Sequence, residues 1–320
     1  MQNSVFMVNT EPYCVWEVDL LTRNNDFLNG IDVEYYSYIL KSHIDCDDSD
    51  DKRAVIAVRN AYYHAMETMY SLFGAFLQAP FCTYAWLGKY KTSDLRDIVK
   101  KINSGETSLE TIVKIDKLSW REIAELVFSY YDPKSDEKKK IIERFSKFWE
   151  RISSEYLNSD YIDEYNSIKH GFRVKSGGFG ISVGIEKEYG NSPPEDNMTV
   201  IGNSEHGSSY FKLSPIGGNS KNRSIKSSQR SVNWTFEKTA ILLQLIEYSI
   251  GNLVSILKIM NGAKPSETKF YLPEDPSCFE KAWQFNSTLI SGSFDFVLDE
   301  EKIPSLSRAE LLKKYSEKRS

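Results

Sequence analysis

Three long stretches of the chain carry apolar residues at helical spacing, and they constrain the fold more than any other feature. In Lys52–Gln78 the apolar side chains recur every three or four residues, from Val55 to Phe76. This spacing places them on one face of an α-helix. The same pattern appears in Asp136–Tyr156 and in Trp234–Met260. Because each apolar stripe must be shielded from water, we expect the three helices to pack together in one core.

Shorter helices are predicted around residues 32–42, 93–103, 107–114, 120–131 and 160–170. The last of these should end at Gly171, since glycine readily takes the left-handed conformation that closes a helix. The acidic run from Asp45 to Asp51 lacks the glycine and the glutamate of a calcium loop. We interpret it as the N-terminal end of the first long helix, where carboxylates favour the helix dipole.

Residues 175–230 differ in composition and are rich in glycine and serine, with nine of the 17 glycines. Between Phe179 and Ile185, apolar residues alternate with small ones, which is the period of a β-strand. Further strands are expected at Thr199–Ile201 and Ser209–Leu213, and others near 270–272 and 294–298. The sequence therefore predicts a mainly α fold, a helical bundle with an inserted β-hairpin region (α+β). Its expected segments are an N-terminal segment (1–50), the first part of the bundle (51–175), the β-hairpin insertion with a basic loop (176–230), the closing helix (231–262) and a C-terminal extension (263–320).

Composition and motif content exclude several classes of protein. An aromatic content of 13% argues against a disordered chain, and a net charge of −5 excludes coating of nucleic acid by bulk charge while allowing a local basic patch. The four cysteines are far apart, and neither a secretory signal nor a membrane span is expected, which predicts a cytoplasmic protein without membrane contact. The glycines at 177–184 miss the dinucleotide-binding spacing by one residue, and the His43 and Cys46 pair has no second pair to complete a metal site. No cofactor and no metal are expected.

Two segments centred on histidine carry the residue types needed for chemistry on phosphate. The first is Arg59-Asn60-x-x-x-His64, within the first long helix. The second lies near the end of the predicted helix at 160–170. There an amide, a lysine, an imidazole and an arginine occupy positions i, i+3, i+4 and i+7. These are Asn166, Lys169, His170 and Arg173. On one helix face they would form a cradle for a phosphate or a carboxylate, with an imidazole that can transfer protons near neutral pH.

A basic stretch without a single acidic residue follows at 219–230, with Lys221, Arg223, Lys226 and Arg230 among serines. It predicts a flexible basic arm suited to phosphate contacts, or else a solvated loop.

The first histidine segment resembles the R-x(4–6)-H signature, with a polar residue after the arginine, of the HEPN superfamily. The members of this superfamily are small helical bundles among prokaryotic toxins, phage-defence proteins and RNA-processing enzymes. The second segment, Tyr165-Asn-Ser-Ile-Lys-His170-Gly171, is similar to the common family form R-N-x-x-x-H-G, with Tyr165 in place of the arginine. The resemblance covers roughly 50–175 and 231–262 and implies a helical fold there.

The resemblance also implies a metal-independent endoribonuclease or an RNA-binding effector in prokaryotic defence or stress. Arg59 would hold the phosphate, His64 would transfer a proton and Asn60 would orient one of them, often in a site shared by two subunits of a homodimer. Asn166 and His170 are further candidate catalytic residues. The candidate phosphate-binding residues are Lys169, Arg173, Lys221 and Arg223. The alternative is a non-catalytic protein–protein interaction or structural module, in which Arg59 and His64 stabilise the fold.

Overall fold

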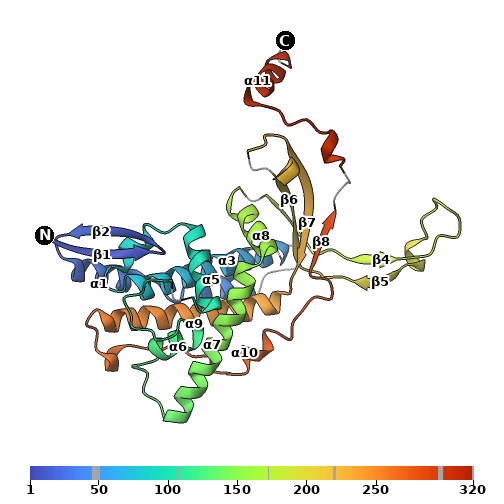
Figure 1. Ribbon diagram of the computed structural model, residues 1–320. Helices are drawn as coiled ribbons and strands as arrows, with labels where there is room; N and C mark the ends of the chain where they lie inside the picture. Colours follow the sequence, from blue (N-terminus) through green and yellow to red (C-terminus); the bar gives the residue numbers. More distant parts are fainter. Residues whose placement is uncertain (45–50, 107, 172, 219–220, 295–297, 319–320) are drawn as a thin grey trace. The chain divides into compact units, whose positions relative to one another are not determined.

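The computed structural model describes residues 1–44, 51–106, 108–171, 173–218, 221–294 and 298–318 (Figure 1). The chain is 52% helical and 15% strand, and the strands of the described residues form three small sheets. The prediction of a mainly α bundle with one inserted hairpin is therefore wrong, and the fold is mixed α and β. Contacts divide the chain into two units, Met1–Ile162 with Phe236–Phe285, and Asp163–Thr235 with Asn286–Ser320.

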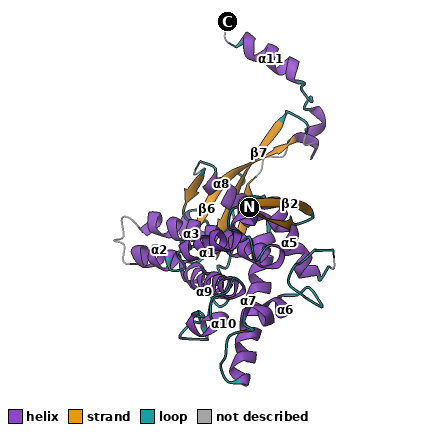
Figure 2. Ribbon diagram, turned by 90° about the vertical axis from the view of Figure 1, so that its left-hand side faces the viewer, coloured by secondary structure: helices purple, strands orange, loops and turns teal. Residues whose placement is uncertain are grey.

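The helical core of the first unit confirms that the three apolar stripes pack together. The Phe73 ring of α3 lies 4.8 Å, centroid to centroid, from Trp149 of α7, and the Trp149 indole donates to the Ser249 hydroxyl of α9 at 2.9 Å. Figure 2 shows α3 and α9, which contact each other along much of their length. The helices of this unit are α1 (Leu20–Gly30), α2 (Tyr35–Ile44), α3 (Asp51–Gln78), α4 (Thr83–Leu87), α5 (Thr92–Ser104), α6 (Trp120–Val127), α7 (Ser135–Leu157), α9 (Phe236–Met260), α10 (Cys278–Lys281) and a short 3-10 helix (Pro265–Glu267).

Helix α9 is long and apolar enough to cross a membrane by length and composition alone, the one such helix within the described ranges. Of its most apolar window, 78% is buried inside the protein. In this structure α9 serves as the central helix of the first unit's core.

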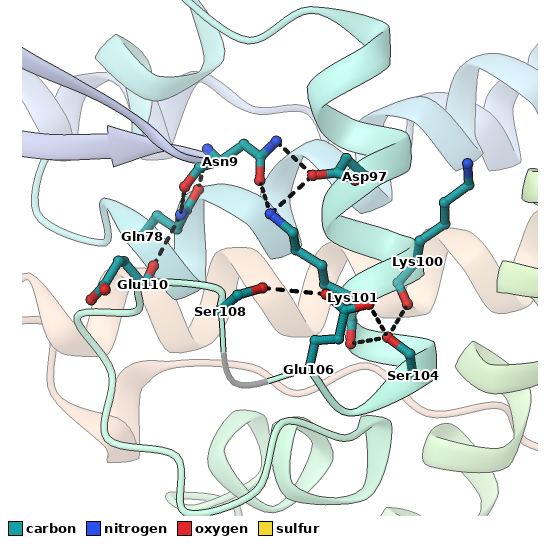
Figure 3. A network of polar contacts seen from close by, with 9 residues as sticks. All are labelled: Asn9, Gln78, Asp97, Lys100, Lys101, Ser104, Glu106, Ser108 and Glu110. Atoms are coloured by element: carbon teal, nitrogen blue, oxygen red, sulfur yellow. Dashed lines mark hydrogen bonds and ion pairs between the residues drawn. The ribbon is translucent and has the colours of Figure 1, made fainter.

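A β-hairpin that the sequence did not predict opens the chain. Strands β1 (Gln2–Val8) and β2 (Glu11–Glu17) pair antiparallel around a turn at Asn9, which has a left-handed φ of 56°. Figure 3 shows the polar network that ties this turn to α3 and α5. The Asn9 main chain exchanges two hydrogen bonds with the Gln78 amide, and its side chain contacts Asp97 and Lys101.

The second unit is built around a four-stranded antiparallel sheet in the order β3-β6-β7-β8. Its fourth strand comes from the segment expected as a C-terminal extension, so the sheet is not a local hairpin. Strands β4 and β5 form a separate two-stranded sheet, and β4 lies within the predicted 179–185 strand. The elements of this unit are β3 (Val174–Ser176), β4 (Ile181–Val183), β5 (Thr199–Gly202), β6 (Gly207–Pro215), β7 (Ile225–Asn233), β8 (Ser291–Phe294), α11 (Arg308–Glu317) and three 3-10 turns (Glu195–Asn197, Ile216–Gly218 and Glu300–Lys302).

Helix α8 (Ser159–Lys169) connects the two units along the chain. Two further predictions are wrong: residues 108–114 form turns and not a helix, and 270–272 form no strand. The backbone at 110–112 is held by contacts distant in sequence, because Ile112 donates to the Leu77 carbonyl and the Glu110 carbonyl accepts from Gln78. The acidic residues 45–50 and Cys46 lie outside the described residues, as does part of the predicted strand at 294–298.

Candidate functional site

Arg59 of the first motif is buried in a cage of tyrosines. Its exposed fraction is 3%, and its guanidinium carbon lies 4.8, 5.1 and 5.2 Å from the ring centroids of Tyr63, Tyr161 and Tyr62. Its Nη2 donates to the Tyr63 hydroxyl at 2.9 Å. Cation–π contacts of this kind stabilise a cation that has lost its hydration. The geometry suits a residue that holds α3 and α8 together.

His64 and Asn60 lie on the exposed side of α3. The His64 Nδ1 is 3.0 Å from the Tyr36 hydroxyl of α2, which is also 3.0 Å from the Thr68 hydroxyl. Burial raises the pKa of Tyr36 to about 12, so this phenol stays protonated at neutral pH. The imidazole of His64 therefore contacts α2, whereas the guanidinium of Arg59 contacts α8 through Tyr161.

The second motif gathers at the C-terminal end of α8. The helix ends at Lys169 and the chain turns through Gly171, whose φ of 97° is the left-handed conformation predicted for it. Lys169, His170 and Arg173 are exposed, and Asn166 is half-buried. The Arg173 main-chain N–H donates to the Ser167 carbonyl at 2.7 Å, so the turn brings Arg173 back beside the last helical turn.

Two details of the second motif differ from the prediction. Arg173 is not on the helix face shared by Asn166, Lys169 and His170, because the helix has already ended. Tyr165, at the position of the family arginine, is buried, and its ring lies 5.2 Å from the Lys169 ammonium. The predicted cradle on one helix face is instead a set of mostly exposed residues at the end of α8, here called the α8 terminal cluster (Asn166, Lys169, His170 and Arg173).

Acidic side chains of α8 fix this helix to one face of the four-stranded sheet. Glu164 is fully buried and accepts hydrogen bonds from the Ser208 hydroxyl at 2.6 Å and the Trp234 indole at 3.0 Å. Asp163 accepts from the Lys212 ammonium at 2.6 Å. A buried carboxylate requires such partners, so these contacts set the position of the α8 terminal cluster relative to the sheet.

The basic stretch is only partly a loop. Lys221 and Arg223 are exposed in the segment before β7, but Lys226 and Arg230 lie within β7 itself. Lys226 also forms an ion pair with Glu300. The interpretation of 219–230 as a flexible arm is therefore wrong from residue 225 onward, and residues 219 and 220 lie outside the described part of the chain.

The opposite face of the sheet carries a groove of about 510 Å³ that the sequence did not indicate. Its lining combines a cation, hydroxyls, an amide and an aromatic ring, from Lys175, Ser176, Gly177, Gly178, Phe179, Ser209, Gln229 and Ser231. The Asn233 side chain accepts from the Phe179 N–H at 2.9 Å and donates to its carbonyl at 2.8 Å. A Cβ on Gly178 would come within 2.0 Å of the Ser204 carbonyl oxygen, so this glycine allows close backbone packing. In the sequence, the only feature that could have indicated this groove was the strand-like alternation of side chains in β6 and β7.

A second groove, of about 490 Å³, runs along α7 in the first unit. Four cations line it at helical spacing: Lys140, Arg144, Lys147 and Arg151. Glu143 pairs with Lys147 at 2.7 Å and Glu280 pairs with Arg151 at 3.6 Å. Much of its charge is therefore already compensated, in contrast to the groove on the sheet.

The two predicted motifs belong to different units, Arg59, Asn60 and His64 to the first and the α8 terminal cluster to the second. Among the described residues no group of three His, Cys, Asp or Glu side chains is arranged to hold a metal ion. Comparison with protein-family models, with characterised proteins and with solved structures finds no match to this chain.

Proposed function

We propose that this chain is an RNA-binding effector whose second unit contacts RNA, and that His170 transfers a proton in metal-independent cleavage of that RNA. The observation that carries the proposal is the α8 terminal cluster, in which the exposed residues Lys169, His170 and Arg173 lie within five positions of the chain at the end of α8. Lysine and arginine side chains are the usual ligands of phosphate.

The distribution of charge supports the assignment to the second unit. The chain is acidic overall, but its acidic excess lies in the first unit, and the second unit has slightly more basic than acidic residues. The negative end of the α8 dipole also favours cations at Lys169 and His170. A polyanion is therefore expected to bind the second unit in preference to the first.

The proposed reaction needs the side chains of this cluster and one water molecule. The 2′-hydroxyl of a ribose attacks the adjacent phosphorus, His170 takes the hydroxyl proton, and the 5′ oxygen leaves and takes a proton from water. His170 then gives its proton to the hydroxide that remains, which restores the neutral imidazole and the water molecule. Lys169 and Arg173 offset the charge on the phosphate. The Asn166 side chain can donate a hydrogen bond to the ribose or accept one from it. The products are a 2′,3′-cyclic phosphate and a 5′-hydroxyl end. In this proposal Arg59 and His64 stabilise the first unit.

Cleavage of a fluorescently labelled single-stranded RNA tests the proposal. We expect His170→Ala to lower the cleavage rate by roughly 100-fold or more, as for loss of a general base, with the melting temperature unchanged because the residue is exposed. His43→Ala, a histidine of α2, is the matched control and should retain full activity. An RNA with 2′-deoxyribose at every position should resist cleavage. Wild-type activity in His170→Ala would rule out this role for His170.

A protein-interaction module is the second candidate, favoured by the β4–β5 sheet. Its apolar side chains face solvent, with Val183 50% and Ile201 65% exposed, and exposed apolar patches commonly mark protein interfaces. Sedimentation of the wild type and of a Val183→Lys, Ile201→Lys variant distinguishes the two functions. A dimer that dissociates in the variant, together with no RNA cleavage by the wild type, would favour the module.

A further inference from the structure

The face of the four-stranded sheet turned away from α8 is defined by strand register. Side chains alternate between the two faces of a strand, and directly paired residues share a face. Ser208 and Lys212 contact α8, so their neighbours Ser209, Phe211 and Leu213 point the other way. Their partners on β7 are Ser231, Gln229 and Ser227, and Lys175 of β3 pairs with Ser209. This set, with Ile225, is called the open face.

The open face carries an exposed aromatic ring at its centre. Phe211 is 69% exposed, and farther along the same face Leu213 and Ile225 are 58% and 55% exposed. The same alternation buries Tyr210 on the α8 side, with 2% exposed. A phenylalanine fixed on a rigid strand and directed to solvent adds nothing to the core of this unit, and it offers a flat surface on which another ring can stack.

The polar groups of the open face suit an anion with hydrogen-bonding edges. Of the described strand residues that share this face, none is acidic and one, Lys175, is a cation. The Ser209 and Ser231 hydroxyls lie 2.6 Å apart in the groove that Gln229 and Phe179 also line. Two further exposed cations, Lys221 and Arg223, precede β7 in the chain.

From this arrangement we infer that the open face binds single-stranded RNA, with one base stacked on Phe211 and the adjacent nucleotide in the groove. The inference rests on the proposed function, since it names the class of RNA and the surface that holds it. Sheets of four strands with exposed aromatic residues bind unpaired bases by stacking. Gln229 and Ser209 can hydrogen-bond a base edge, with the buried Ser231 hydroxyl holding Ser209 in place, and Lys175 can contact a phosphate. A duplex hides its bases, so it cannot use Phe211.

Fluorescence anisotropy with a single-stranded RNA that carries 2′-O-methyl riboses tests the inference, because this RNA can bind but cannot be cleaved by the proposed chemistry. Stacking contributes about 1–3 kcal/mol per base, so Phe211→Ala should weaken binding by roughly 5- to 150-fold. Phe211→Leu keeps an apolar side chain and should lose most of the same affinity. Lys175→Ala should weaken binding and reduce the slope of log K against log salt by about 0.7.

The control is Tyr189→Ala, an exposed aromatic residue in the same unit but outside the open face. It should bind as the wild type does, and a blunt duplex RNA should bind more weakly than the single strand. Wild-type affinity in Phe211→Ala or in Phe211→Leu would overturn the inference, as would a loss of affinity in Arg144→Glu of the α7 groove without a loss in Phe211→Ala. Cleavage that depends on His170 would still stand in those cases, so failure of the open face and failure of the proposed function are distinguishable.

Discussion

Replacement of Gln78 by alanine should strongly destabilise the first unit, because this side chain joins the N-terminal hairpin to the helices. Gln78 is 1% exposed and uses its full hydrogen-bonding capacity. Its Oε1 accepts from the Asn9 N–H at 2.8 Å and from the Trp86 indole at 3.4 Å. Its Nε2 donates to the Asn9 and Glu110 carbonyls, both at 2.9 Å. Truncation leaves all four partner groups unsatisfied.

At about 1 kcal/mol for each lost hydrogen bond, with the long Trp86 bond contributing least, Gln78→Ala should lower the free energy of unfolding by about 3–4 kcal/mol. Urea denaturation followed by tryptophan fluorescence measures this change. Asn9→Gly is the control, because glycine keeps the left-handed turn and the main-chain bonds to Gln78 and loses only the side-chain contacts. It should cost about 1 kcal/mol, and Asn9→Ala should cost roughly 1 kcal/mol more for the left-handed backbone. A loss below about 1 kcal/mol in Gln78→Ala would show that this network does not anchor the hairpin.

Two stability predictions concern other buried groups of the first unit. Tyr70→Phe should leave stability unchanged or raise it by about 1 kcal/mol, since its hydroxyl is buried without a hydrogen-bond partner among the described residues. Tyr62→Phe is the matched change, and it should cost about 1–2 kcal/mol because its hydroxyl donates to Glu155 at 2.9 Å. Urea denaturation measures the free energy of unfolding of both variants. An equal change in the two would contradict the assignment of a hydrogen bond to the Tyr62 hydroxyl and of none to the Tyr70 hydroxyl. Desolvation raises the pKa of Glu247, so the native state binds its proton more tightly than the unfolded chain does. Stability should therefore fall as pH rises from about 4.3 through this raised pKa, and Glu247→Gln should flatten that decline in melting temperature against pH.

The long helices were predictable because their signal is local and repeated. The helices α3, α7 and α9 hold six to eight turns of apolar spacing each, at about 3.6 residues per turn, and no competing pattern interrupts them. The end of α8 was predictable for a similar reason, since Gly171 alone accounts for it. The β1–β2 hairpin was missed because only Phe6 and Val8 of β1 are buried, which is too short an alternation to be distinguished from a loop.

Non-local pairing accounts for the errors in the sheet and in the site. Strand β8 pairs with β7 although α9, a 3-10 helix and α10 separate the two strands in the chain, and the residues of one strand do not specify the other as its partner. The burial of Arg59 depends on Tyr161, about a hundred positions away, so the motif alone could not distinguish a cage from a phosphate site. The open face could have been suggested by the alternation in β6, but which side α8 covers depends on the contact between Glu164 and Ser208.

Photochemical cross-linking tests the central claim, that the second unit binds single-stranded RNA, most directly. A thiouridine-substituted RNA is irradiated with the full-length protein, and the attached peptides are identified by mass spectrometry. We predict cross-links in the peptides that contain β6, β7 and the end of α8, and loss of the β6 cross-links in Phe211→Ala. Cross-links confined to the α7 groove or elsewhere in the first unit would contradict the account.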